Sequence, residues 1–100
     1  MTPEEALRRL EQHRDAIDQI DLAILERLNA RARIVEQIGA IKKEMRFPIY
    51  EPKREDAVFR NVLTGNQGPL SEAAVRRLFE RIIDEMRTLQ RDRMEEENQG

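Results

Sequence analysis

The fold is decided by residues 3–45, PEEALRRLEQHRDAIDQIDLAILERLNARARIVEQIGAIKKEM, where neither glycine nor proline follows Pro3 until Gly39. Thr2 is in position to cap a helix here, Pro3 suits its first position, and Glu5 completes a capping box. One helix of about 42 residues would be about 63 Å long. A domain of 100 residues has a radius of gyration of only about 13 Å. The helix therefore needs a partner for its apolar side, and we expect a second copy of the chain.

Two shorter helices are predicted to follow. Segment 46–52 holds two prolines and should be an extended loop, after which Pro52 opens a second helix that segment 64–69 stops. Ser71 should cap a third helix with an apolar stripe, and residues 93–100 form a polar tail that we expect to fray. The expected architecture is one all-α domain over residues 1–100. It has a very long, a short and a medium helix and forms an intertwined homodimer.

Composition excludes several kinds of function. The chain is 39% hydrophobic and 38% charged with a net charge of -2, which does not indicate a nucleic-acid partner. There is no cysteine, and His13 is the one histidine, so thiol chemistry and a histidine-based metal site are not expected. No stretch reaches the roughly 18 apolar residues of a membrane span or resembles a signal peptide. We expect a soluble, cytoplasmic protein without a metal or membrane partner.

The apolar seam of the first helix is interrupted by charges. Steps of three and four residues trace this seam through Leu7, Leu10, Arg14, Ile17, Asp21, Ile24, Leu28, Arg31, Val35, Ile38, Lys42 and Met45. Buried charges cost free energy unless they are paired. Such residues can set the register of a coiled coil, and long cations can reach the edge of a seam. Three cations with a single acid also fit an anionic ligand.

The spacing of the three cations adds a constraint. Arg31 and Lys42 are 11 residues apart on one face, about 16 Å along the axis, which leaves room for a small anion between their side chains. Arg14 lies 17 residues before Arg31, about 25 Å away on the same rod. If all three bind one ligand, Arg14 must come from an antiparallel partner helix.

Three further features have both a structural and a functional interpretation. Gly39 inside the first helix can serve close helix packing or leave clearance for a ligand or a facing helix. Gln90 interrupts the stripe of the third helix, as a structural polar group or as part of a site. The charged residues at the start of the second helix can simply cap it and face solvent. Yet Arg54 and Glu55 lie one turn before Val58 and Phe59, on its inward side.

Together these elements resemble the all-helical class of chorismate mutases. The resemblance covers about residues 7–92 and rests on Arg14, Arg31, Gly39, Lys42, the run 48–55 (PIYEPKRE), Ile82, Ile83 and Gln90. It implies an intertwined dimer whose two active sites mix residues of both chains. The implied activity is the pericyclic rearrangement of chorismate to prephenate in aromatic amino-acid biosynthesis, which needs no cofactor.

The resemblance also implies a role for each matching residue. Lys42 and Gln90 would donate to the ether oxygen of the breaking bond, and Lys42 would also contact a carboxylate. Arg14 would bind a substrate carboxylate across the dimer and Arg31 within its own subunit, with Arg54 in support. Glu51 and Glu55 match positions that handle the ring hydroxyl. Two departures are Glu51, where the family often has Asp, and the substrate-contacting position Met86, where some members have a small hydroxyl residue.

Two rival functions remain open at this point. One is an isochorismate-pyruvate lyase of the same fold, which uses a similar anion cage. The other is a helical dimerisation or regulatory module associated with, or fused to, the first enzyme of the shikimate pathway.

Overall fold

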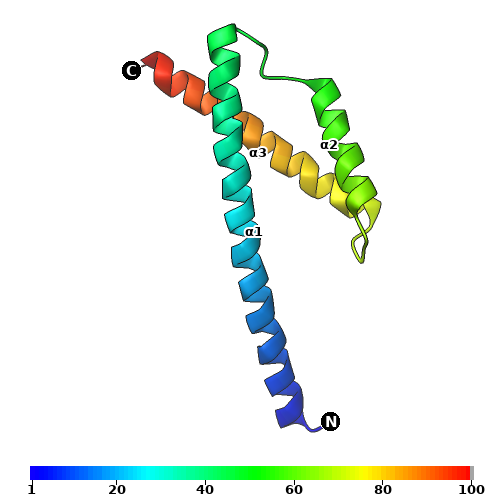
Figure 1. Cartoon of the computed structure of the whole chain (residues 1–100). Coiled ribbons are helices and arrows are strands. Elements are labelled where there is room, and N and C mark those ends of the chain that lie inside the picture. Colours follow the sequence, from blue (N-terminus) through cyan, green and yellow to red (C-terminus); the bar gives the residue numbers. More distant parts are fainter. Residues whose placement is uncertain (100) are drawn as a thin grey trace. The chain divides into compact units, whose positions relative to one another are not determined.

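The computed structural model describes the backbone of residues 1–99 and the side chains of residues 1–95. Over this range the chain forms three helices, α1 (Pro3–Met45), α2 (Pro52–Gly65) and α3 (Glu72–Gln99), and no strand (Figure 1). The predicted all-α class and helix order are confirmed. The chain divides into two compact units, Met1–Arg33 and Ile34–Gly100, so α1 begins in the first and ends in the second. Side chains beyond 95 lie outside the described residues, and fraying of 93–100 stays a prediction.

The N-terminus of α1 is closed by the predicted capping box. The Glu5 backbone N–H donates to Thr2 Oγ1 at 3.1 Å, and the Thr2 backbone nitrogen lies 3.4 Å from Glu5 Oε2. These reciprocal contacts satisfy backbone donors that a helix start otherwise leaves without partners. The local signal read from the sequence therefore places the first residue of α1 correctly.

The C-terminus of α1 is closed without glycine. Arg46 adopts a φ of 58°, in the left-handed region. Its backbone N–H donates to the Lys43 carbonyl at 3.3 Å, and the Phe47 N–H donates to the Lys42 carbonyl at 2.8 Å. This pair of bonds is a Schellman motif, which normally carries glycine at the left-handed position. The turn reverses the chain one turn after Lys42 and directs it toward α2.

Replacing Arg46 with Gly is expected to raise the free energy of unfolding by about 0.5–1 kcal/mol. The left-handed conformation costs an ordinary residue about 1–2 kcal/mol, and the greater flexibility of glycine in the unfolded state offsets part of the gain. Urea unfolding at a fixed protein concentration measures the change. Arg46→Ala is the control, because it removes the same side chain and keeps the unfavourable φ. An equal gain in both variants would mean that the side chain, not the backbone, is the cause.

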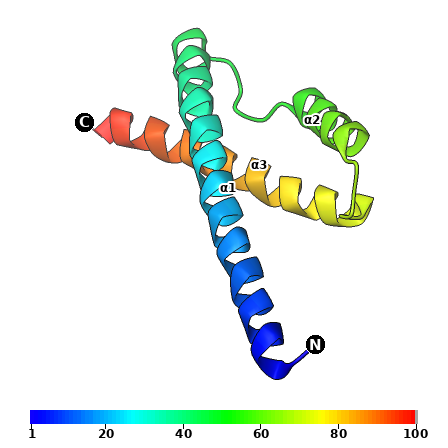
Figure 2. The ribbon, with the colours of Figure 1, turned by 60° about the horizontal axis from the view of Figure 1, so that its bottom comes forward.

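The α2–α3 connection and the start of α3 follow the sequence signals. The Asn66 side chain accepts from the Gly68 N–H at 3.0 Å and donates to the Leu70 carbonyl at 2.8 Å. Ser71 Oγ then accepts from the Ala74 N–H at 3.1 Å, which confirms Ser71 as the cap of α3. The chain turns back here, and α3 packs beside α2 (Figure 2).

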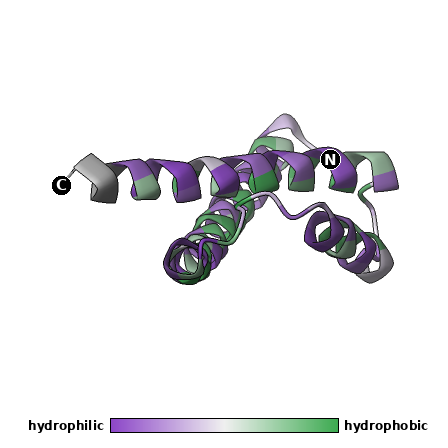
Figure 3. Cartoon of the chain, turned by 90° about the horizontal axis from the view of Figure 1, so that it is seen from above, coloured by the Kyte–Doolittle hydropathy of each residue, from purple (hydrophilic) through white to green (hydrophobic). Residues whose placement is uncertain are grey.

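The apolar residues of one chain are only partly covered. Apolar and polar residues alternate along all three helices, as Figure 3 shows. Val75 and Ile83 of the predicted α3 stripe are buried, whereas Leu78 is exposed. In the unit Met1–Arg33 most large apolar side chains of α1 are exposed in the single chain, namely Leu7, Leu10, Ile17, Ile20, Leu22, Ile24 and Leu25. A patch of this extent is typical of an interaction surface.

Candidate active site

Lys42 and Gln90 distinguish themselves by burial. Among the residues whose side chains the structure describes, these are the two buried polar or charged residues, with 8% and 7% of their surface exposed. Lysine and glutamine are ordinarily surface residues, and burying their polar ends costs free energy unless hydrogen bonds replace water. A single chain of 100 residues has only a small core in which to place such groups. Their position therefore marks the start of a candidate site.

The Lys42 ammonium is held by the segment that enters α2. Its Nζ lies 2.8 Å from Glu51 Oε1 and donates to the Ile49 carbonyl at 3.1 Å. Glu51 occupies the N-cap position of α2, yet its side chain makes no capping bond there. The carboxylate binds Lys42 instead, so a local capping interaction gives way to a contact between α1 and the start of α2. Departures of this kind from local rules are typical of functional sites.

Gln90 reaches from α3 to the backbone of α1. Its Nε2 donates to the Val35 carbonyl at 3.3 Å. Gly39 is buried beside it, and a Cβ at Gly39 would lie 3.4 Å from Gln90 Cγ. The structure places this glycine in the packing contact between α1 and α3, against the side chain of Gln90, as the close-packing interpretation predicts. Gly39 also lies one turn before Lys42, so it brings Gln90 near the helical turn that carries the ammonium.

Each of the two buried groups retains one donor for a ligand. An ammonium has three N–H donors, and Lys42 uses two of them on Glu51 and Ile49. A side-chain amide has two, and Gln90 uses one on Val35. Within the described part of the chain, one N–H of each group thus stays available. Fixed donors of this kind can stabilise negative charge that develops on a bound molecule.

The acid Glu55 is held by Arg87 of α3, which was not among the residues predicted for the site. Arg87 Nη2 donates to Glu55 Oε2 at 2.7 Å, with the two side chains 29% and 24% exposed. The Arg87 guanidinium also lies over the Tyr50 ring, 5.4 Å from its centroid. One signal for Arg87 is present in the sequence: it lies four residues after Ile83 and three before Gln90, on the same face of α3.

The other predicted residues are less engaged in the single chain. Arg54 is exposed on the first turn of α2, although the sequence suggested an inward position, while Met86 on α3 is half-buried. Arg14 and Arg31 belong to the unit Met1–Arg33. Arg31 is half-buried, and Arg14 is exposed and pairs with Glu11, one turn earlier, at 3.0 Å. The unit Ile34–Gly100 therefore holds the acids and the two buried donors, and the roles of Arg14 and Arg31 stay predictions.

Comparison with known proteins gives this arrangement a family. Residues 13–91 match the family model described as chorismate mutase type II. The chain belongs to this family. A bifunctional chorismate mutase/prephenate dehydratase of Neisseria gonorrhoeae is 42% identical over 79 residues, which cover 79% of this chain and 21% of that protein. The corresponding protein of Aquifex aeolicus is 34% identical over 86 residues, covering 82% and 24%.

A solved chorismate mutase supports the same assignment of fold. The form II structure from Thermus thermophilus superimposes with a TM-score of 0.81 at 31% sequence identity, over 83% of this chain and 94% of that one. The resemblance found in the sequence is thus confirmed. The chain spans less than a quarter of the length of the curated bifunctional relatives named above. These relatives pair a chorismate mutase with a prephenate dehydratase, whereas the alternative left open by the sequence was an association with the first shikimate-pathway enzyme.

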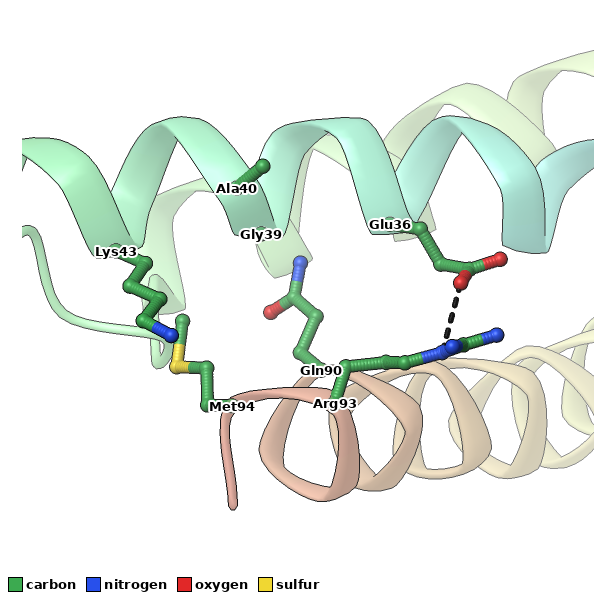
Figure 4. A pocket seen from close by; sticks show the side chains of 7 residues that line it. All are labelled: Glu36, Gly39, Ala40, Lys43, Gln90, Arg93 and Met94. Atoms are coloured by element: carbon green, nitrogen blue, oxygen red, sulfur yellow. Dashed lines mark ion pairs between the residues drawn. The ribbon is translucent and has the colours of Figure 1, made fainter. Parts of the chain in front are cut away.

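A small cavity lies beside Gln90 in this member of the chorismate mutase type II family (Figure 4). Its volume is about 100 Å³, and it is lined by Glu36, Gly39, Ala40, Lys43, Gln90, Arg93 and Met94. Glu36 and Arg93 form an ion pair at 2.8 Å along one side of it. Gln90 is the one predicted site residue in the lining, and pockets for small-molecule ligands usually measure about 300–1,000 Å³. We therefore place the site by the contacts of Lys42, Gln90 and the two acids.

The described residues offer neither a metal site nor a membrane span. They hold no group of three or more His, Cys, Asp or Glu side chains that could bind a metal ion. No helix among them is both long enough and apolar enough to cross a membrane.

Proposed function

We propose that the chain catalyses the rearrangement of chorismate to prephenate. The observation that carries this proposal is the burial of Lys42 and Gln90, each with one donor left for a ligand. Family membership supplies the identity of that ligand. The reaction breaks a carbon–oxygen bond and forms a carbon–carbon bond within one molecule, so no nucleophile, proton transfer or cofactor is required of the protein.

The protein can accelerate this rearrangement in two ways. Negative charge grows on the ether oxygen as its bond breaks, and the free N–H groups of Lys42 and Gln90 meet that charge. Both donors are fixed before the substrate arrives, by Glu51 and Ile49 on one side and by Val35 on the other. The second way is to hold the flexible enolpyruvyl arm over the ring, which converts a rare conformer into the bound one.

The remaining predicted residues hold the substrate. We assign Arg31 and Arg54 to the substrate carboxylates, because the planar guanidinium group binds carboxylates through two parallel hydrogen bonds. Arg14 of a second copy completes this clamp. Glu51 and Glu55 accept hydrogen bonds from the ring hydroxyl, and Met86 contributes an apolar contact where some relatives have a hydroxyl side chain.

The direct test is a chorismate assay with purified chain. We expect chorismate absorbance to fall and prephenate to accumulate. Product identification separates the rivals, because an isochorismate-pyruvate lyase would release pyruvate from isochorismate and leave chorismate unchanged. A purely regulatory module would bind chorismate or prephenate without turnover. The location of the activity in the cytoplasm, and any association with the first shikimate-pathway enzyme, stay predictions.

We further propose that the active unit is an intertwined homodimer. The exposed apolar side chains of α1 in the unit Met1–Arg33 need a cover, and a second α1 offers a matching stripe. Arg14 is exposed in the single chain, and its partner among the described residues is its neighbour Glu11, through a surface ion pair. Surface pairs of this kind contribute about 0–1 kcal/mol, so Arg14 can exchange Glu11 for a substrate carboxylate at small cost.

Mixing two inactive variants tests the shared site. Arg14→Ala and Lys42→Ala chains are each expected to be nearly inactive as homodimers. In a mixed dimer one site carries both substitutions and the other carries neither. With equal mixing, half of the dimers are mixed and one of their two sites is intact, so about a quarter of wild-type activity returns. Subunit exchange is followed with a size-tagged chain, and exchange without recovery would contradict the shared site.

A further inference from the structure

Arg87 lies on the face of α3 that carries the site. It follows Ile83 by four residues and precedes Gln90 by three, so the three side chains share one side of the helix. Ile83 and Gln90 are 9% and 7% exposed. Arg87 lies between them with 29% of its side chain exposed. A cation in this position is not a solvated surface residue, and its environment therefore calls for an explanation.

The guanidinium of Arg87 is held by three groups. Asp84, one turn earlier on α3, lies 3.6 Å from Nη1, and the Tyr50 ring lies beneath the group at 5.4 Å. The third partner is Glu55 Oε2, at 2.7 Å from Nη2. Because Asp84 and Tyr50 orient the plane of the guanidinium, its bond to Glu55 has a defined direction. This bond connects α3 to the first turn of α2, 32 positions apart in sequence.

We infer that Arg87 is a positioning residue that orients the Glu55 carboxylate toward the ring hydroxyl of the substrate. This inference rests on the proposed function, in which Glu55 accepts a hydrogen bond from that hydroxyl. A glutamate side chain alone samples many rotamers, and ordering it on binding costs conformational entropy. Arg87 orders it in advance through Oε2, which leaves Oε1 to accept a hydrogen bond from the ring hydroxyl. Arg87 thereby sets a preference for substrates that carry a hydroxyl at this ring position.

The test compares chorismate with an analogue that lacks the ring hydroxyl. Arg87→Met keeps most of the length of the side chain and removes the bond to Glu55. We expect kcat/KM for chorismate to fall by about 10–100-fold, the usual effect of losing a hydrogen bond to a charged group, and kcat/KM for the analogue to change by less than about threefold. In a Glu55→Gln background, adding Arg87→Met should cause less than about threefold further loss with chorismate, because the two residues act as one unit.

Two further variants keep the inference testable. Arg81→Met is the matched control, because Arg81 lies on α3, is 77% exposed and pairs with Glu85 one turn along; it should leave both substrates unaffected. If Arg87→Met does not fold, as judged by circular dichroism, Arg87→Lys retains the charge without the planar fork. It should lower kcat/KM for chorismate and spare the analogue.

An equal loss for chorismate and its analogue would overturn the inference, because Arg87 would then act through packing or overall charge. An unchanged Arg87→Met chain would overturn it as well. Failure of the proposed function is a separate result: the wild-type chain itself would not convert chorismate.

Discussion

Replacing Lys42 with Ala is expected to lower kcat for chorismate by about 10²–10³-fold, the usual effect of losing one donor to a developing oxyanion. The structure explains why no other group substitutes for it. Lys42 is 8% exposed, so little water can reach the vacated position. Its partner Glu51 is an acid and cannot donate to the ether oxygen when ionised. Steady-state rates at saturating chorismate measure the effect.

The control for Lys42→Ala is Lys53→Ala, which removes the same side chain from an exposed position on the first turn of α2. It should turn over chorismate at nearly the wild-type rate. Circular dichroism of both variants separates a catalytic loss from unfolding, since Lys42 also anchors Glu51 and the Ile49 carbonyl. A folded Lys42→Ala chain with near wild-type kcat would refute the role assigned to the ammonium.

Gln90→Glu is expected to confine activity to acidic pH. An ionised carboxylate has no proton to donate to the ether oxygen, so the variant works only when this carboxyl is protonated. Burial and the nearby Val35 carbonyl oxygen both disfavour the charged form, so the pKa of the new carboxyl should lie above the ordinary value of about 4.3. Activity is therefore present below that pKa and lost as pH rises through it, reaching about 10²-fold loss at neutral pH.

The pH profile of kcat/KM from about pH 4.5 to about pH 8 measures this loss of activity with rising pH. The wild-type amide is neutral throughout that range and causes no such loss. Gln90→Met is the control, because it has a similar length and no ionisable group; it should be slow at every pH. A profile of Gln90→Glu that parallels the wild type would count against contact between Gln90 and the ether oxygen.

The helices were predictable from the sequence because their signals are local. Thr2 with Glu5, Pro52 and Ser71 each act within one helical turn, and the observed starts of α1, α2 and α3 follow them. The end of α1 at Met45 was also expected, from the prolines that follow. Its closure was not, because Arg46 adopts a left-handed conformation that usually indicates glycine. This left-handed conformation is stabilised by the two backbone hydrogen bonds of the turn, which no residue type in the sequence indicates.

The site was predictable in its residue types and only partly in its contacts. Lys42 and Gln90 stood out because each interrupts an apolar pattern, and both are buried. Arg87 also lies on the apolar face of α3, but this helix carries several arginines and acids, and nothing in the sequence favours Arg87 among them. Arg54 shows the opposite case, since its place in the charged start of α2 suggested an inward side chain and the single chain leaves it exposed.

The sequence by itself determined three helices, where each of them begins, and an apolar seam interrupted by charges, because caps, prolines and apolar periodicity act over a few residues. The tertiary structure alone decided the partners: Glu51 for Lys42, the Val35 carbonyl for Gln90, and Arg87 for Glu55. The latter two contacts join residues far apart in the chain, and the first depends on how the connection after α1 folds back. Which side chain meets which therefore depends on the rotation and packing of whole helices, and no local pattern encodes it.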